Sequence, residues 1–505
     1  MAAINLSTGR VRLLVFGLLM TALIAIYAGQ ERWAQAQAPD FLPSRRGIGL
    51  LVVAGIVYLL GAWRLVKKRS TQPSGACFTL PVVLVAAAAM RILISLTPPL
   101  DTNDYERYLW DGAVTANGLS PYLYPPGATL YPDAAQKLPR GLKQLAADSG
   151  GLPGRIRQPY APSLYPPVAQ GFFALAHTIS PFRPLGWRII LLLADAAAAF
   201  LVFLLLRERG LSLTWLALYL FNPLLIIENC QVLHLDALLV VLLMLFACLL
   251  HWHRPGWAAL VLALAVGVKL WPIFLLPFLI ARVGRHKMAQ WKTLGIFGGV
   301  CAWLMLPYIS ALMEHTGGFT SLLKNWRTPL GLYPALERMV MAVSNLLMPM
   351  LEGQWLAFWG VLIFIFYFCV IQAGQITRQH RDLFHRVGLA ILLIALIQPA
   401  SYPWCFVGLI PLAAVSPRLA LLLPSALMPL VYLLPGHSHR LLWGVLIQLP
   451  LWIGLVLDSG IWSRRKPEAA EQHQADISGR AGRLEAALAL SREDTAAMNR
   501  PSMSP

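Results

Sequence analysis

Residues 101–112, DTNDYERYLWDG, carry four acids and one arginine in a chain of which 13% is charged. We expect residues 101–117 to form a helix that Gly118 ends. Four residues at spacings of three, four and three then share one face: Asp101, Asp104, Tyr108 and Asp111. Arg107, at the edge of this face, cannot neutralise these acids together with Glu106. At least one carboxylate therefore lacks a nearby cation and could accept a proton from a hydroxyl group.

A structural interpretation of the same residues stays open beside the catalytic one. Ion pairs between Asp104 and Arg107 and between Arg107 and Asp111 would each contribute about 0.2–0.5 kcal/mol. Acids are also favoured near the start of a helix, where the backbone N–H groups are unpaired. The pattern fits an exposed helix held by such pairs as well as it fits an active site.

Apolar stretches fill most of the remaining chain. Of the 505 residues, 57% are hydrophobic, whereas a soluble domain would carry roughly 25% charged residues. A helix needs roughly 20 apolar residues to cross a bilayer. We therefore expect an all-α polytopic membrane protein. The sequence predicts about 14 transmembrane helices, at residues 12–29, 48–63, 78–96, 186–206, 211–227, 234–252, 255–268, 270–282, 292–312, 355–373, 387–400, 402–415, 419–434 and 441–457.

Basic residues cluster in alternate loops between these expected spans. Short loops rich in Lys and Arg resist translocation, which predicts cytoplasmic termini. The same rule assigns five clusters to the cytoplasmic side: Arg64/Lys67/Lys68/Arg69, Arg207/Arg209, Arg282/Arg285/Lys287, Arg378/Arg381/Arg386 and Arg464/Arg465/Lys466. Because these loops account for most of the net charge of +18, the charge does not indicate nucleic-acid binding.

The expected spans divide the chain into six segments. These are N-terminal transmembrane helices at 1–96, a long periplasmic loop with surface helices at 97–185, central transmembrane helices at 186–312, a second periplasmic loop at 313–354, C-terminal transmembrane helices at 355–462 and a cytoplasmic tail at 463–505. In the first loop, a second helix is expected to start at Pro166 or Pro167, where a missing N–H costs nothing. Four apolar residues would let this helix lie in the membrane surface: Phe172, Phe173, Leu175 and Ala176.

Asp195 lies inside the expected span 186–206. A charge at the centre of a membrane helix costs roughly 2.5–3.5 kcal/mol, so Asp195 needs a partner. Arg188, two turns earlier on the same face, and Arg91, in a preceding span, are the candidates, and an ion pair is the expected role.

Other ionisable residues interrupt apolar stretches on the outer side. His234 and Asp236 could be a loop residue and an acid at a helix start, or could line a cavity. Lys269, between two short spans, could reach the interface or bind a lipid phosphate. Lys324 and Arg327, in the second outer loop, are further candidates for binding phosphate.

The six cysteines lie in or beside apolar stretches, without the spacing of metal ligands: Cys77, Cys230, Cys248, Cys301, Cys369 and Cys405. We expect them to pack as small apolar side chains, and we expect no metal site. The sequence contains no P-loop and no Gly-rich nucleotide fingerprint, so a soluble nucleotide sugar is not the expected donor.

Five blocks resemble, in the same order, blocks of the polyprenol-phosphate-mannose-dependent glycosyltransferases of the GT-C superfamily: DYERYLWDGAVTANGLSPYLYPP, LYPPVAQ, FNPLLIIENCQVLHLDALL, VGVKLWPIFLLP and QPASYPWCFVGLIPL. Bacterial and mycobacterial membrane mannosyltransferases and the catalytic subunit of GPI mannosyltransferase I are similar. The resemblance implies the GT-C fold, a sugar donor on a polyprenyl monophosphate, an acceptor hydroxyl on the non-cytoplasmic face, and inversion at the sugar carbon.

The resemblance also implies roles for individual residues. The aspartate that acts as base in that family matches Asp104, whose tyrosine partner matches Tyr108, and Asp101 is the second candidate. The GPI enzyme separates its two acids by one residue, whereas Asp101 and Asp104 are separated by two, so the choice of base and the use of a metal stay open. Further residues are expected to bind donor or acceptor: Tyr108, Asp111, Arg107, Tyr165, His234, Asp236, Lys269, Lys324 and Arg327.

These implications predict an enzyme of the bacterial inner membrane whose active site faces the periplasm. Its partners would be a lipid-linked sugar donor, a glycolipid or glycan acceptor and membrane lipids, with no nucleic acid and no obligatory cofactor or metal. The main alternative is a flippase for a lipid-linked saccharide, which would use the same cavity and a buried pair between Arg188 and Asp195. A non-catalytic scaffold subunit is the third possibility.

Overall fold

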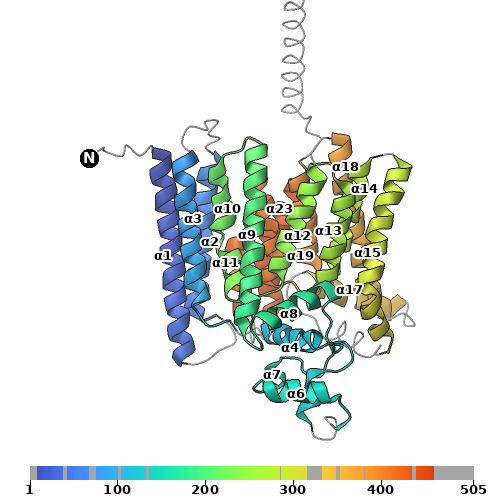
Figure 1. Cartoon of the computed structure of the whole chain (residues 1–505). Helices are drawn as coiled ribbons and strands as arrows, with labels where there is room; N and C mark the ends of the chain where they lie inside the picture. Colours follow the sequence, from blue (N-terminus) through green and yellow to red (C-terminus); the bar gives the residue numbers. More distant parts are fainter. Residues whose placement is uncertain are drawn as a thin grey trace, which may run out of the picture.

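The computed structural model describes residues 8–37, 43–67, 76–100, 104–131, 136–284, 286–314, 332–347, 353–379, 382–434 and 439–459. All regular structure in these ranges is helical, and most helices stand side by side in one bundle (Figure 1). This arrangement confirms the expected all-α class.

Three helices form one flank of the bundle (Figure 1): α1 (Thr8–Gln37), α2 (Arg45–Lys67) and α3 (Ala76–Ser95). Glu31 of α1 is buried, and its carboxylate accepts hydrogen bonds from the backbone N–H and the hydroxyl of Ser44, the latter at 2.7 Å. Because a buried carboxylate needs such donors, this contact ties α1 to the residue that precedes α2.

The middle of the bundle contains a long helix and a broken one. Helix α9 (Pro184–Glu208) is continuous, whereas α10 (Leu216–Leu220) and α11 (Pro223–Cys230) belong to one apolar segment that bends by 52°. The Asn222 side chain caps α11 by accepting from Leu225 N at 3.0 Å, with Pro223 at the first helical position. A break in a membrane helix leaves backbone carbonyls without helical partners. Here Arg91 donates a hydrogen bond to Leu220 O at 2.9 Å.

Three further helices complete this half: α12 (Asp236–His251), α13 (Pro255–Val268) and α15 (Lys287–Glu314). The C-terminal half consists mainly of α17 (Tyr333–Leu347), α18 (Gly353–Gln379), α19 (Leu383–Ile397) and α23 (Arg440–Ser459). Helix α19 is buried along its whole length, so the core of this half is built around it. Short helical pieces at 403–433 connect α19 to α23.

Six helices are long and apolar enough to cross a membrane: Val11–Gln37, Arg45–Lys67, Pro184–Glu208, Lys287–Ile309, Gly353–Thr377 and Arg440–Ser459. The bent pair Leu213–Leu220 and Pro223–Cys230 raises the number to as many as seven. Shorter apolar helices of 10–17 residues lie at the remaining expected spans. The described residues thus form a multi-pass membrane protein, and fourteen crossings remain a prediction.

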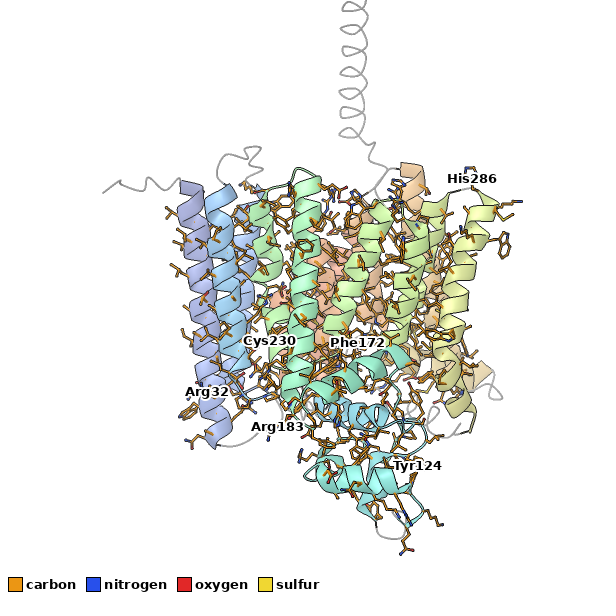
Figure 2. All side chains as sticks on the ribbon, viewed as in Figure 1. Arg32, Tyr124, Phe172, Arg183, Cys230 and His286 are labelled. Carbon is orange, nitrogen blue, oxygen red and sulfur yellow. The ribbon has the colours of Figure 1, made fainter. Side chains whose placement is uncertain are left out.

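The described basic loops meet at one end of the bundle. Arg209, after α9, lies 3.6 Å from Asp382, before α19. Arg282 donates to Leu250 O, near the end of α12. His286 lies at this end, whereas Tyr124 and Arg183 lie at the other (Figure 2). Some of the basic residues expected here lie outside the described residues: Lys68, Arg69, Arg285, Arg381 and Arg464–Lys466.

The long loop forms a helical cap at the end of the bundle opposite to the start of α1 (Figure 1). It contains α4 (Asp104–Ala116), η1 (Pro126–Leu130), α6 (Arg140–Asp148), α7 (Leu152–Arg155) and α8 (Pro167–Ile179). Helix α4 ends near Gly118, whose φ of +71° is the left-handed conformation that ends the expected helix. Its expected start at Asp101 lies outside the described residues.

Helix α8 begins where the sequence predicts, with Pro167 at its first position. Phe173 and Ala176 are buried in protein, whereas the Leu175 side chain is 49% exposed. The apolar residues therefore pack mainly against the cap and the bundle, and only part of the set is free to contact lipid.

Candidate active site

Close packing between α4 and α8 positions the acidic helix. A Cβ added to Gly112 would lie 2.2 Å from the Phe173 carbonyl oxygen, so only glycine permits this approach. One turn away, the Tyr108 ring stacks on Phe173 with centroids 4.6 Å apart and meets Trp187 of α9 edge to face. The Tyr165 ring completes the cluster at 5.1 Å from Tyr108. Tyr108 and Tyr165, both expected to bind substrate, thus form an aromatic anchor for α4.

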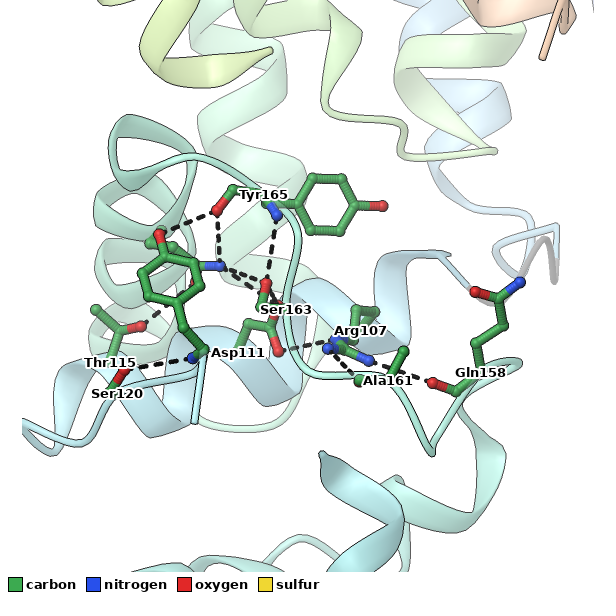
Figure 3. Close-up of polar contacts among 10 residues, drawn as sticks. Arg107, Asp111, Thr115, Ser120, Gln158, Ala161, Ser163 and Tyr165 are labelled. Atoms are coloured by element: carbon green, nitrogen blue, oxygen red, sulfur yellow. Dashed lines mark hydrogen bonds and ion pairs between the residues drawn. The ribbon is translucent and has the colours of Figure 1, made fainter. Parts of the chain in front are cut away.

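Asp111 is the centre of a buried polar network (Figure 3). Arg107 Nε donates to Oδ1 of Asp111 at 2.9 Å, and the Ser163 hydroxyl donates to Oδ2 at 2.5 Å. Gln170 Nε2 donates to Ser163 Oγ at 2.7 Å. Burial raises the pKa of Asp111, and the neighbouring Arg107, Ser163 and Gln170 oppose that rise. We call these four residues the Asp111 network.

Arg107 also holds the segment that runs past α4. Its guanidinium donates to Ala161 O at 2.9 Å and to Gln158 O at 3.4 Å (Figure 3). Ser163 N donates to Pro121 O in the same region. We call residues 156–163 the strap. Arg107 and Asp111 therefore join α4 to the strap, and direct contact of either residue with a substrate stays a prediction.

Asp104 differs from the two other acids of α4, a helix that the structure describes in full. Glu106 is buried and lies 2.7 Å from Arg155 Nε, and Asp111 pairs with Arg107. The Asp104 side chain is 32% exposed, and its Oδ2 lies 3.6 Å from Nε2 of His234. The expected contact between Asp104 and Arg107 is replaced by this contact with His234.

A strained turn brings His234 to Asp104. Leu233 has a φ of +59°, which is unfavourable for a residue with a Cβ. Two hydrogen bonds hold this conformation: Trp187 Nε1 donates to Leu233 O at 2.8 Å, and His234 N donates to Glu228 O at 3.2 Å. The imidazole is 4% exposed, so its position is set by protein contacts.

His234 continues into a line of charged groups. Its Nδ1 lies 2.5 Å from Oδ2 of Asp236, the first residue of α12. Lys269 Nζ donates to the same oxygen at 2.5 Å. Asp104, His234, Asp236 and Lys269 therefore form what we call the charge chain. Its inner end is buried and paired, and its outer end is the exposed carboxylate of Asp104.

The other face of His234 packs on aromatic rings that sequence reasoning did not single out. Trp404 stacks on the imidazole with centroids 4.3 Å apart, and Tyr402 stacks on Trp404 at 4.4 Å. We call these three rings the aromatic column. In the sequence, the signal was the aromatic pair Tyr402 and Trp404, which lies between two apolar stretches in the block QPASYPWCFVGLIPL.

Asp195 has the partner expected from the preceding span. Arg91 Nε lies 2.5 Å from Asp195 Oδ2, and the Tyr219 hydroxyl donates to Oδ1 at 2.7 Å. Arg188 is not the partner and donates to Ser95 O at 2.7 Å. The pair of Arg188 and Asp195 invoked for a flippase is therefore wrong.

The remaining predicted site residues, Asp101, Lys324 and Arg327, lie outside the described residues. Among the residues that are described, no group of three or more His, Cys, Asp or Glu side chains is arranged to hold a metal ion. The charge chain instead contains its own cation, Lys269.

The fold is a multi-pass helical bundle with a cap. In the cap, one partly exposed carboxylate lies beside a buried histidine. Together they define a membrane protein with a candidate acid–base site. A family model described as Alpha-(1->6)-mannopyranosyltransferase, N-terminal domain (the MptA_B family), matches residues 11–285. Because the match covers just over half of the 505 residues, the chain belongs to this family. The protein is a membrane glycosyltransferase that transfers mannose, and the resemblance to membrane mannosyltransferases is confirmed.

The matched residues contain α4, the turn at His234 and Lys269, and they end before Tyr402 and Trp404. No curated protein and no solved structure matches the chain.

Proposed function

We propose that the protein transfers mannose from a polyprenyl-phosphate donor to a hydroxyl group of a glycolipid or glycan, with Asp104 as general base. The observation that carries this proposal is the exposure of Asp104 beside His234, while Glu106 and Asp111 are paired with arginines. An acid held at the surface of the cap can meet both a lipid-linked donor and an acceptor from outside the bundle. A GT-C fold is part of the proposal.

The proposed reaction is a single displacement. As the acceptor oxygen attacks the anomeric carbon, Asp104 takes the hydroxyl proton. The bond between that carbon and the phosphate oxygen breaks, and the polyprenyl phosphate leaves with the electron pair. Attack from the side opposite to the leaving group inverts the configuration of the sugar carbon.

The charge chain supports the base by fixing His234. Asp236 lies against Nδ1, and Lys269 in turn neutralises Asp236, which directs Nε2 toward Asp104. A histidine positioned in this way limits the orientations of the Asp104 carboxylate and can share its proton after transfer. Because cations can neutralise a monophosphate, we propose that no metal is obligatory. Full activity in excess chelator is the expected result.

The proposed orientation places the cap in the periplasm and the protein in the bacterial inner membrane. Support comes from Arg209 and Arg282, which lie among the basic loops at the other end of the bundle. Asp148→Cys in the cap should react with a membrane-impermeant maleimide in intact spheroplasts. Labelling only after lysis would show that the cap lies on the cytoplasmic side.

Transfer by purified protein tests the function. Radiolabelled polyprenyl-phosphate-mannose would be supplied with a crude lipid and glycan extract, and wild type compared with Asp104→Asn. The variant should lose about a hundredfold to ten-thousandfold in turnover. Asp148→Asn is the matched control, because Asp148 is exposed in the same loop and its carboxylate accepts hydrogen bonds from Gln144.

Equal transfer by wild type and Asp104→Asn would remove Asp104 from the mechanism. Transfer absent with every extract, together with movement of a lipid-linked saccharide across vesicles, would favour the flippase.

A further inference from the structure

Most cations near Asp104 are already engaged. Arg107, Arg155 and Lys269 each lie within 2.9 Å of a carboxylate oxygen. Arg188 donates to the Ser95 carbonyl. The charges of Arg107, Arg155 and Lys269 are thus each compensated by a carboxylate of the protein.

Arg157 is different. Its side chain is exposed, and among the described residues no ion pair joins it to a carboxylate. It lies on the strap, two residues after Arg155. Its charge is therefore available to a ligand.

The backbone of the strap is held firmly beside Arg157. Arg107 binds the carbonyls of Gln158 and Ala161 (Figure 3). Gly127 N donates to Pro159 O at 2.7 Å, and a Cβ at Gly127 would lie 2.9 Å from that oxygen. Beside Arg157 the strap is thus positioned through main-chain carbonyls, without use of the Arg157 side chain.

Arg157 also faces the aromatic column. Its guanidinium lies close enough to the Tyr402 hydroxyl to act on it electrostatically, and the charge of Asp104 acts on the same hydroxyl. Tyr402 stacks on Trp404, and Trp404 stacks on His234. The column therefore places a guanidinium and a phenol on the same side of the cap as the proposed base.

From this arrangement we infer that Arg157 and the Tyr402 hydroxyl bind the phosphate of the lipid-linked donor. A guanidinium offers several N–H donors that match phosphate oxygens, and the phenol offers one more. The inference rests on the proposed function, because it names the donor-binding residues of that same site.

The chemistry of the leaving group gives this site a role in the reaction. The donor phosphate is a diester with one negative charge, and the departing polyprenyl phosphate is a monoester that gains a second. A fixed cation beside it interacts more strongly with the developing charge than with the bound donor. Lys269, which Asp236 holds, then supports His234 and does not meet the phosphate.

Binding measurements with a short prenyl phosphate test the site without requiring transfer. Purified protein in a neutral detergent would be titrated with geranyl phosphate and, separately, with geraniol. Arg157→Gln should weaken geranyl phosphate binding by about 10- to 100-fold, and Tyr402→Phe by about 3- to 10-fold. Arg157→Lys should recover part of the loss, since it restores charge without the planar donors.

Matched controls separate a local site from general attraction. Arg140→Gln removes an equal charge from the exposed start of α6 and should bind geranyl phosphate as wild type does. Geraniol binding should be the same in all variants. Inorganic phosphate and phosphatidic acid serve as competitors, and both should compete weakly.

Wild-type binding that does not need the phosphate, or equal binding by wild type, Arg157→Gln and Tyr402→Phe, would overturn the inference. Competition by inorganic phosphate or phosphatidic acid as strong as that of geranyl phosphate would also overturn it. If Arg157 governs geranyl phosphate binding but no mannose is transferred, the phosphate site stands and the proposed function fails. If transfer proceeds and Arg157→Gln leaves both kcat and the KM for donor unchanged, the proposed function stands and the phosphate site fails.

Discussion

The Asp111 network and the charge chain both join acids to cations near α4, but they differ in how they end. In the Asp111 network, Asp111 is met from all sides by Arg107, Ser163 and Gln170. In the charge chain, pairing runs from Lys269 outward and stops at the part-exposed Asp104. A closed network stabilises the cap, whereas an open-ended one can exchange a proton with a substrate. Substitutions in the charge chain should therefore mainly lower activity, and substitutions in the Asp111 network should mainly lower stability.

The largest expected effect is on turnover. Asp104→Ala removes the open end of the charge chain and should lower kcat by about a hundredfold to ten-thousandfold. Because the carboxylate is partly exposed, the thermal unfolding midpoint in detergent should stay near that of wild type. A large drop in that midpoint would show that Asp104 is structural, like Asp111.

The next effect is on stability. Asp111→Ala leaves the buried Arg107 without its carboxylate and should lower the free energy of unfolding by about 3–5 kcal/mol. Thermal unfolding of the purified protein measures this change. An unchanged unfolding midpoint with lost donor binding would instead make Asp111 a ligand-binding residue.

A smaller effect is expected where α4 crosses α8. Gly112→Ala would force a Cβ against the Phe173 carbonyl and should destabilise the protein by about 1–3 kcal/mol. The control is Gly171→Ala on α8, where a Cβ meets nothing within 4 Å and should stabilise the helix by up to about 1 kcal/mol. Equal unfolding midpoints for the two variants would contradict the close approach.

The smallest effect concerns pH. Burial raises the pKa of Asp111 in the folded protein. Such a group contributes stability below its unfolded pKa of about 3.9 and loses that contribution as pH rises through the folded value. The stability of wild type relative to Asp111→Asn should therefore be greatest below about pH 4 and fall as pH rises. A difference that grows with pH would mean that the pKa is lowered.

The sequence predicts local features of this molecule well because their causes are local. The start of α8 follows from Pro167, and the end of α4 follows from Gly118. The pair of Arg107 and Asp111 follows from their spacing of one helical turn. Apolar length predicts most helices, although it does not establish how many of them cross the membrane.

The contacts that build the candidate site could not be predicted, because they join distant segments. His234 reaches Asp104 only through the strained turn that Trp187 holds. Arg188 was a poor partner for Asp195 in principle, since seven residues of helix separate their Cα atoms by about 10 Å. Arg91 lies on a neighbouring helix at the depth of Asp195 and pairs with it directly.

The way in which the strap is fastened also affects how such an enzyme can diversify. Besides the Ser163 hydroxyl, its anchors are the main-chain oxygens of Gln158, Pro159 and Ala161, which every amino acid possesses. Mutations at Arg157 therefore leave these main-chain contacts in place while they alter what the strap presents. Selection can therefore change the side chain at this position without rebuilding the scaffold.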